Sequence, residues 1–353
     1  MKVHSKLKNP IRLISITLLT AGLVACGGGG SDPAPVGGTG SGGTGGGGTG
    51  GGGTGGGGTA TAPITKSNYT TVAGFGYGLA GFSGTIAQAS GAGVTNNPAR
   101  SSATKLTSRA TTTDPATCVS SGSGSNTSNI AVQGQVSNGD SYSGTFENCR
   151  NDNPPPVGGY YLLDGSYTFT YSNVTGNYFF GDVGSVVING QYNQFSFGGE
   201  FPPQPAFSVS FDGRTTYELE KTATTHRLKL TSNNFTFGST HGSESTTFAM
   251  TNINTEVKDN LADGTQTITG GYDIVVTTTP DVFSGSFAVT FDVQGMTASE
   301  NPSSGTVTIR DKNSAAIIVI TVLSETLVQV AFDENGDGTP EETKPFTPED
   351  LGG

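Results

Sequence analysis

The residue pattern best suited to chemistry is the acidic segment FDENGDGTPEE near the C-terminus. Its oxygen-bearing side chains occupy alternate positions, and a glycine follows where a tight turn is needed. Carboxylate and amide oxygens at this spacing can converge on a hard cation such as Ca²⁺. The candidate ligands of this calcium site are Asp333, Asn335, Asp337, Thr339 and Glu341.

This segment departs from the twelve-residue EF-hand pattern, because Lys344 stands where a bidentate carboxylate would close the site. It resembles more closely the shorter Asp-x-Asp-x-Asp-Gly calcium loops, in which Glu341 or Glu342 would be the closing ligand. The alternative is a solvated hairpin turn between Val330 and Phe346, since Asn-Gly and Asp-Gly are common turn pairs. The residue pattern fits both interpretations, so Ca²⁺ is a candidate cofactor and not an assigned one.

Other segments match known binding or catalytic motifs in residue type but lack the structural context that those motifs need. Residues 76–81 contain the glycines of a dinucleotide-binding fingerprint, but no strand-and-helix pattern surrounds them. His226 and His241 do not form a metal-binding pair such as His-Glu-x-x-His. Two carboxylates on a β scaffold would suit glycan hydrolysis, but the pattern singles out no pair. Whether the chain is an enzyme is therefore uncertain, a non-enzymatic role is favoured, and no catalytic residue is assigned.

The N-terminus reads as an export signal over residues 1–25. Four basic residues precede an apolar stretch, Leu13 to Ala25, that carries no charge. As a helix this stretch would span only about 20 Å, against roughly 30 Å for a bilayer core. The sequence Leu23-Val24-Ala25-Cys26 resembles the lipobox of bacterial lipoproteins. This resemblance implies cleavage before Cys26 and its modification with acyl chains such as palmitate, which anchor the chain to a membrane.

Residues 26–59 are almost entirely Gly, Thr and Ser, a composition that cannot bury apolar surface and indicates a flexible tether. A lipidated cysteine followed by polyglycine resembles surface lipoproteins such as the transferrin-binding and factor-H-binding proteins. The resemblance covers the anchor and the tether only. Gly27 in place of the aspartate typical of inner-membrane retention implies the outer membrane, facing either the periplasm or the cell surface.

The charge balance restricts the partners. The chain has 17 basic and 28 acidic side chains, with a net charge of −11. The predicted signal removes Lys2, Lys6, Lys8 and Arg12 and no acidic residue, so the mature chain is more acidic still. This excludes nucleic acid and charge-driven adhesion to anionic membranes. The expected partners are the membrane, through Cys26, and an unknown protein or glycan ligand.

The two remaining cysteines are expected to pair. If Cys26 carries lipid, Cys118 and Cys149 are left in an oxidising compartment, which favours a disulfide between them. The alternative is a pair of buried free thiols.

Residues 60–353 read as one β-rich domain. Alternating runs such as Phe287, Val289 and Phe291 indicate half-buried strands, and no sustained helical period is visible. Similar segments recur about every 40 residues, at 165–204, 205–242, 243–284 and 285–324, before an acidic hairpin at 325–353. We therefore predict an all-β fold of repeated antiparallel meanders, forming an elongated barrel or sandwich, with a β-propeller as the alternative.

Within each repeat we expect four short strands, as in 206–211, 214–220, 225–231 and 234–238. Ahead of the repeats, the region from Tyr69 to Ile86 is expected to be strand-like. A long polar loop is expected from Ser90 to Asn129.

Together these features predict a lipid-anchored outer-membrane lipoprotein that presents a β-rich binding or cell-envelope interaction module. The alternatives are a carboxylate-dependent glycan hydrolase of the envelope or surface, and a structural or adhesin spacer stiffened by calcium.

Overall fold

The protein is described here by a computed structural model. The residues that it describes are 63–78, 105–132, 136–152, 158–176, 183–203, 205–279, 284–297, 299 and 301–351. The predicted signal, Cys26 and the predicted tether lie outside these residues.

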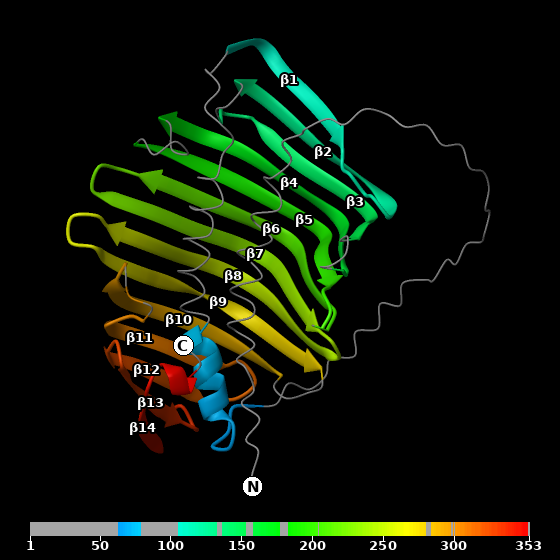
Figure 1. The fold of residues 1–353 in the computed structure, drawn as a ribbon. Coiled ribbons are helices and arrows are strands. Elements are labelled where there is room, and N and C mark those ends of the chain that lie inside the picture. Colours follow the sequence, from blue (N-terminus) through cyan, green and yellow to red (C-terminus); the bar gives the residue numbers. More distant parts are fainter. Residues whose placement is uncertain are drawn as a thin grey trace.

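The described strands form one 14-stranded antiparallel sheet in which each strand pairs with the next along the chain (Figure 1). This confirms the all-β antiparallel meander. The strands are β1 (Lys105–Pro115), β2 (Ser121–Val132), β3 (Ser141–Asp152), β4 (Tyr160–Gly176), β5 (Gly184–Glu200), β6 (Phe207–Lys221), β7 (Thr225–His241), β8 (Glu244–Asn260), β9 (Thr265–Thr279), β10 (Gly285–Met296), β11 (Ser304–Asp311), β12 (Ile317–Ser324), β13 (Leu327–Asp333) and β14 (Glu342–Phe346).

The alternating pattern decides which face of the sheet is buried. In β10, Phe287, Val289, Phe291 and Val293 are at most 4% exposed, whereas the alternating residues Thr290 and Asp292 are exposed. Because side chains of a strand alternate between its two faces, this places one apolar face against the core and one polar face outward.

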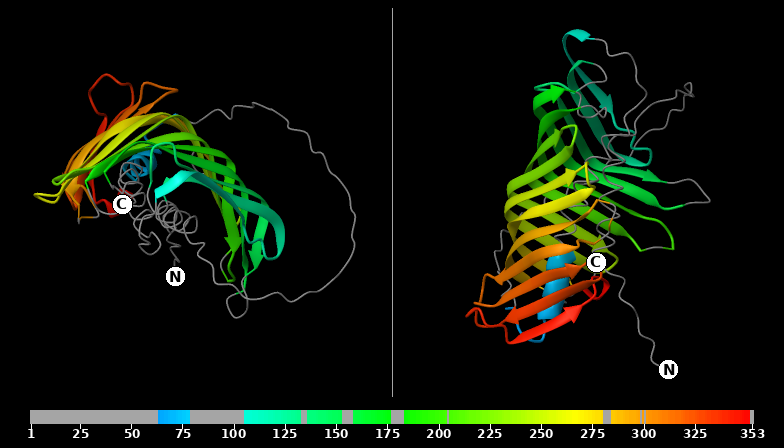
Figure 2. Two further views of the ribbon diagram at one scale, coloured as in Figure 1. Left: turned by 90° about the horizontal axis from the view of Figure 1, so that it is seen from above. Right: turned by 90° about the vertical axis from the view of Figure 1, so that its left-hand side faces the viewer.

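The sheet is strongly curved and open, with β1 and β14 at its two edges (Figure 2). It is not closed into a barrel, since the described part of the chain pairs β1 only with β2 and β14 only with β13. The propeller alternative does not hold either, because a propeller consists of separate sheets, one for each blade.

Each predicted pair of short strands is one long strand. β6 and β7 each run through the positions where the sequence indicated a turn, and they keep their pairing on both sides of a register shift between Arg214 and Thr216. Gly213, with a φ of +108°, directly precedes this irregularity. A β-bulge bends a strand without ending it, so its glycine and asparagine residues resemble those of a turn.

These irregularities line up across the sheet. Register shifts occur at neighbouring positions from β3 to β7, between β3 and β4, β4 and β5, β5 and β6, and β6 and β7, and another occurs between β8 and β9. Because every bulge adds local twist and bend, a row of them curves the whole sheet. The concave face that results is the face that carries the core.

A helix replaces the strand expected near Tyr69. Residues 69–78 are helical, and Tyr69, Val72, Ala73 and Tyr77 are all at most 5% exposed. Their spacing places them on one face of a helix. The helix lies on the concave side of the sheet (blue in Figures 1 and 2).

Two glycines let this helix approach its neighbours closely. A Cβ atom on Gly76 would lie 2.3 Å from Cδ1 of Ile309, and one on Gly74 would lie 2.6 Å from the backbone oxygen of Leu351. Because glycine has a low helix propensity, we attribute this helix to its packing against the sheet and not to local propensity.

The polar region expected to be a loop also contains strands. β1 and β2 pair along most of their length, although residues 90–104 lie outside the described residues. The sequence did not indicate this hairpin because it contains few apolar residues. Thr and Ser can form strands without a marked alternation of hydrophobic residues.

Candidate functional site

The acidic segment forms the turn between β13 and β14 and brings the five predicted ligands into one loop. Asp333 accepts hydrogen bonds from the backbone N–H of Gly336 through Oδ1 (2.7 Å) and of Gly338 through Oδ2 (2.8 Å). Asn335 and Asp337 each accept one from the residue two positions later, at 2.8 Å. These are Asx-type contacts, in which a side chain stabilises the turn that follows it.

Glu341 closes the same loop from the other side. Its Oε2 accepts a hydrogen bond from the backbone N–H of Glu334 (2.6 Å), and its Oε1 accepts one from Nδ2 of Asn335 (3.0 Å). Most of the predicted ligand oxygens therefore already accept bonds within the loop. Among the described residues, no group of three or more His, Cys, Asp and Glu side chains is placed to hold a metal ion.

We expect the loop to behave as a hairpin stabilised by hydrogen bonds. Replacing Asp333 with alanine leaves two backbone N–H groups without their acceptor and should lower the free energy of unfolding by about 1–3 kcal/mol. The loss should be equal in millimolar Ca²⁺ and in EDTA, measured by thermal melting. Asp333→Asn, which keeps one acceptor oxygen, is the control. A melting temperature of the unmodified chain that rises with Ca²⁺ would instead establish the calcium site.

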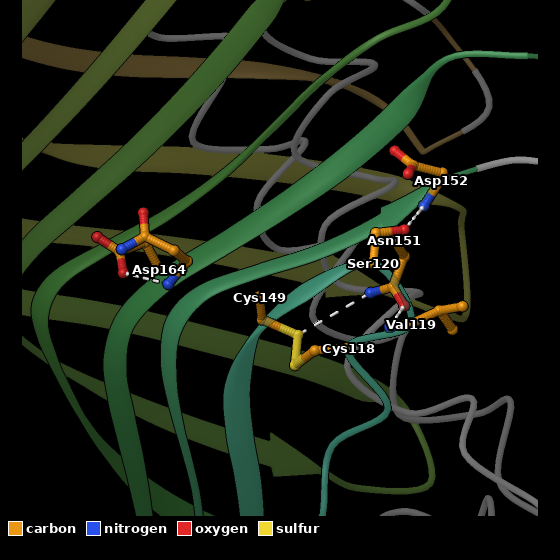
Figure 3. The surroundings of a disulfide bond; sticks show 8 residues. Cys118, Val119, Ser120, Cys149, Asn151, Asp152 and Asp164 are labelled. Carbon is orange, nitrogen blue, oxygen red and sulfur yellow. Dashed lines mark hydrogen bonds between the residues drawn. A yellow bond between two sulfur atoms is a disulfide. The ribbon is translucent and has the colours of Figure 1, made fainter. Parts of the chain in front are cut away.

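The predicted disulfide is present. Cys118, in the turn between β1 and β2, is bonded to Cys149 in β3, with the two Cα atoms 5.0 Å apart (Figure 3). Cys149 is 1% exposed. Beside it, Oδ1 of Asn151 accepts a hydrogen bond from the backbone N–H of Val119 at 3.0 Å. The disulfide and this bond together hold the β1–β2 turn against β3.

The two histidines lie near opposite ends of β7 and do not form a common site. His226 stands between Lys221 of β6 and Asp259 of β8 in the strand register. Burial, followed by the positive charge of Lys221, lowers the pKa of His226. A neutral imidazole results at neutral pH, with its Nε2 atom buried and without a hydrogen-bond partner in the described part of the chain.

The largest feature that the sequence analysis missed is a set of aromatic rings on β3 to β7, here called the aromatic cluster. Neighbouring rings lie 5.1–6.4 Å apart between centroids. Aromatic pairs at this spacing stabilise a fold by more than the burial of their apolar surface alone contributes. Its members are Tyr142, Phe146, Tyr167, Phe169, Tyr192, Phe195, Phe211 and Phe235.

The aromatic cluster has a buried part and a half-buried part. Tyr167, Phe146 and Phe211 are 4–7% exposed, whereas Phe169 and Phe195 are half-buried. Glycine makes room for one of the buried rings, because a Cβ atom on Gly144 would lie 2.7 Å from the ring of Tyr167. The half-buried rings leave part of their apolar surface available for contact.

Ring contacts link the aromatic cluster to the helix. Phe211 contacts Phe237, which contacts Phe248, and Phe248 stacks on Phe75 of the helix with ring centroids 5.7 Å apart. The cluster and the helix therefore share the concave face. The stacking partners of the helix, Phe248 and Phe332, belong to β8 and β13, so these contacts fall towards the β14 end of the sheet.

The alternation of aromatic residues within each strand was visible in the sequence, but their assembly was not. Tyr167 lies opposite Tyr192, and Phe195 lies opposite Phe211, only because of the strand register, which the bulges shift. A one-residue slip would place these rings on the other face.

Comparison of this chain with known protein families, with characterised proteins and with solved structures finds no match. Within the described residues, no helix combines the length and the apolar character needed to cross a membrane.

Proposed function

We propose that this protein is a lipid-anchored lipoprotein of the bacterial outer membrane, whose open curved sheet binds a protein or glycan ligand at the cell envelope. The lipobox-like residues ending at Cys26, followed by the glycine-rich tether, support the anchor. The orientation of the domain, towards the periplasm or the cell surface, belongs to the same proposal and is tested with it.

The observation that carries the binding part is the aromatic cluster on the concave face. Half-buried rings on adjacent strands form an apolar surface that is fixed in shape, because each ring is held by its neighbours at 5.1–6.4 Å. Aromatic side chains contribute large contact areas at low conformational cost in both protein and ligand recognition.

The hydrolase alternative receives less support. A glycosidase needs one carboxyl group with a raised pKa to act as the general acid. Where the surroundings clearly change the pKa of a described carboxyl group, they lower it. Hydrogen bonds from Ser120 and Arg150 lower the pKa of Asp152, and a hydrogen bond from Thr265 lowers the pKa of Asp263. We therefore propose binding and not hydrolysis as the function.

The anchor is tested by metabolic labelling. Cells that express the full chain and are fed radiolabelled palmitate should incorporate label into this protein, and Cys26→Ser should abolish the incorporation. Digestion of intact cells with protease, with lysed cells as the control, then reports the orientation. Equal labelling of the Cys26→Ser chain would contradict the anchor.

The binding surface is tested by photo-cross-linking in living cells. Benzoylphenylalanine at Phe169, a half-buried ring of the aromatic cluster, is expected to give an adduct of higher mass upon irradiation. Val275 is the matched control, because it is 40% exposed and lies on the opposite face, between buried Ile274 and Val276. An added mass that glycosidase treatment removes indicates a glycan ligand, and an added mass that persists indicates a protein ligand. No adduct at Phe169, or equal adducts at both positions, would contradict the proposal.

A further inference from the structure

The two edges of the sheet differ in how well they are protected against pairing with another strand. The edge strand β14 has only five residues, with Lys344 and Pro345 in its sequence. Proline removes a backbone donor, and charged side chains discourage pairing, so such an edge is blunted. β1 has 11 residues, and its only proline, Pro115, is the last.

Among the described residues, no strand pairs with the outer side of β1. Within the described chain β1 pairs with β2 alone, in unbroken register from Ala110 to Pro115. Thr111, Thr112 and Thr113 are exposed. Every second residue of an edge strand directs its backbone N–H and C=O away from the sheet, so this segment presents a row of unpaired donors and acceptors.

We propose that this edge pairs with the same edge of a second copy of the chain, giving a two-fold symmetric dimer with a continuous sheet. The two copies of β1 run antiparallel about an axis at Thr112, the middle of the three exposed threonines 111–113. Thr112 then faces the partner's Thr112, and Thr111 faces the partner's Thr113.

The charge distribution permits a second copy as the occupant at this segment. The chain carries a net charge of −11, so most pairings of two copies bring like charges together. Residues 110–113 are Ala-Thr-Thr-Thr and carry no charge, and the proposed register places Asp114 opposite the partner's Ala110. Threonine pairs on neighbouring strands also form hydrogen bonds, as Thr113 and Thr127 already do at 3.0 Å between their Oγ1 atoms.

The blunted β14 edge favours a closed dimer over an assembly that grows by adding further copies. Pairing of β1 with β14 of another copy would be a heterologous contact, which repeats from copy to copy and produces rings or filaments. β14 is short and contains Pro345, so the heterologous contact is disfavoured, whereas the β1–β1 contact uses up both available edges. The proposed assembly is therefore a dimer. It rests on the strand edges alone and does not depend on the lipid anchor or on the aromatic cluster.

The dimer is tested by sedimentation equilibrium on the purified full chain in detergent over a range of concentrations. We expect the mass to rise to that of two chains, and Thr112→Lys to return it to one, because the substitution places two like charges opposite each other on the axis. Thr343→Lys, at an exposed position of β14, is the matched control and should leave the dimer intact. Circular dichroism melting checks that both variants fold.

Cysteine cross-linking provides a second measurement. Residues directly opposite in an antiparallel pair have Cα atoms about 4.5–5.5 Å apart, within the range that a disulfide spans. Thr112→Cys should therefore form a covalent dimer on a non-reducing gel, whereas Thr343→Cys should not. A monomer at every concentration, a Thr112→Lys chain that still dimerises, or equal cross-linking of both cysteine variants would overturn the proposal.

Discussion

Replacing Phe332 with alanine is expected to lower the free energy of unfolding by about 3–5 kcal/mol, the usual cost of removing a buried aromatic ring. Phe332, in β13, is fully buried. Its ring stacks on that of Tyr69 at a centroid distance of 4.9 Å, so the substitution opens a cavity between the helix and the sheet. The loss should therefore affect the attachment of the helix as well as the core.

Denaturant unfolding followed by circular dichroism measures this loss, since the chain has no tryptophan for fluorescence. Phe332→Leu, which keeps most of the apolar volume, should cost clearly less. Hydrogen exchange at residues 69–78 should become faster in Phe332→Ala than in Val275→Ala, a substitution on the opposite face. A loss below about 1 kcal/mol, smaller than that of typical core truncations, would show that the helix does not depend on this contact.

Removing the disulfide with the double substitution Cys118→Ala and Cys149→Ala is expected to cost about 3.5–4 kcal/mol. The two cysteines are 31 residues apart, and the chain-entropy treatment of a loop of this length gives a value of that size. The effect should be concentrated in the β1–β2 hairpin, because it contributes few apolar residues to the core and is tied to β3 by this bond.

The measurement is denaturant unfolding with and without reductant. Reductant should shift the unfolding midpoint of the unmodified chain towards that of the double variant and should leave the double variant unchanged. A double variant that unfolds at the same midpoint as the oxidised chain would show that strand pairing alone holds the hairpin.

Local residue patterns were sufficient for the fold class and for the disulfide. Alternating residues such as Phe287 and Val289 can bury one face only as strands, so the β structure follows from the side-chain period of two. The pairing of Cys118 with Cys149 was predicted from the number of cysteines and the expected oxidising compartment, and the structure contains it.

Local patterns were not sufficient where the same residues suit two structures. Glycine and asparagine near Gly213 are compatible with a turn and with a β-bulge, and only the pairing of β6 with β7 on both sides selects the bulge. Residues 69–78 contain Gly74 and Gly76, which disfavour a helix locally, but close packing against Ile309 and Leu351 requires them. In both places long-range contacts outweigh local preference.

The sequence by itself therefore determined the all-β meander, the acidic character and the disulfide, because each depends on residue type and short spacing. Only the tertiary structure decided that the sheet stays open, that its bulges align into one curve, and that the aromatic cluster gathers on the concave face. The physical reason is strand register. The register brings Tyr167 opposite Tyr192, and it is set by pairing between strands and not by the local residue pattern of either strand. The strand order of the sheet, in turn, leaves β1 at an edge.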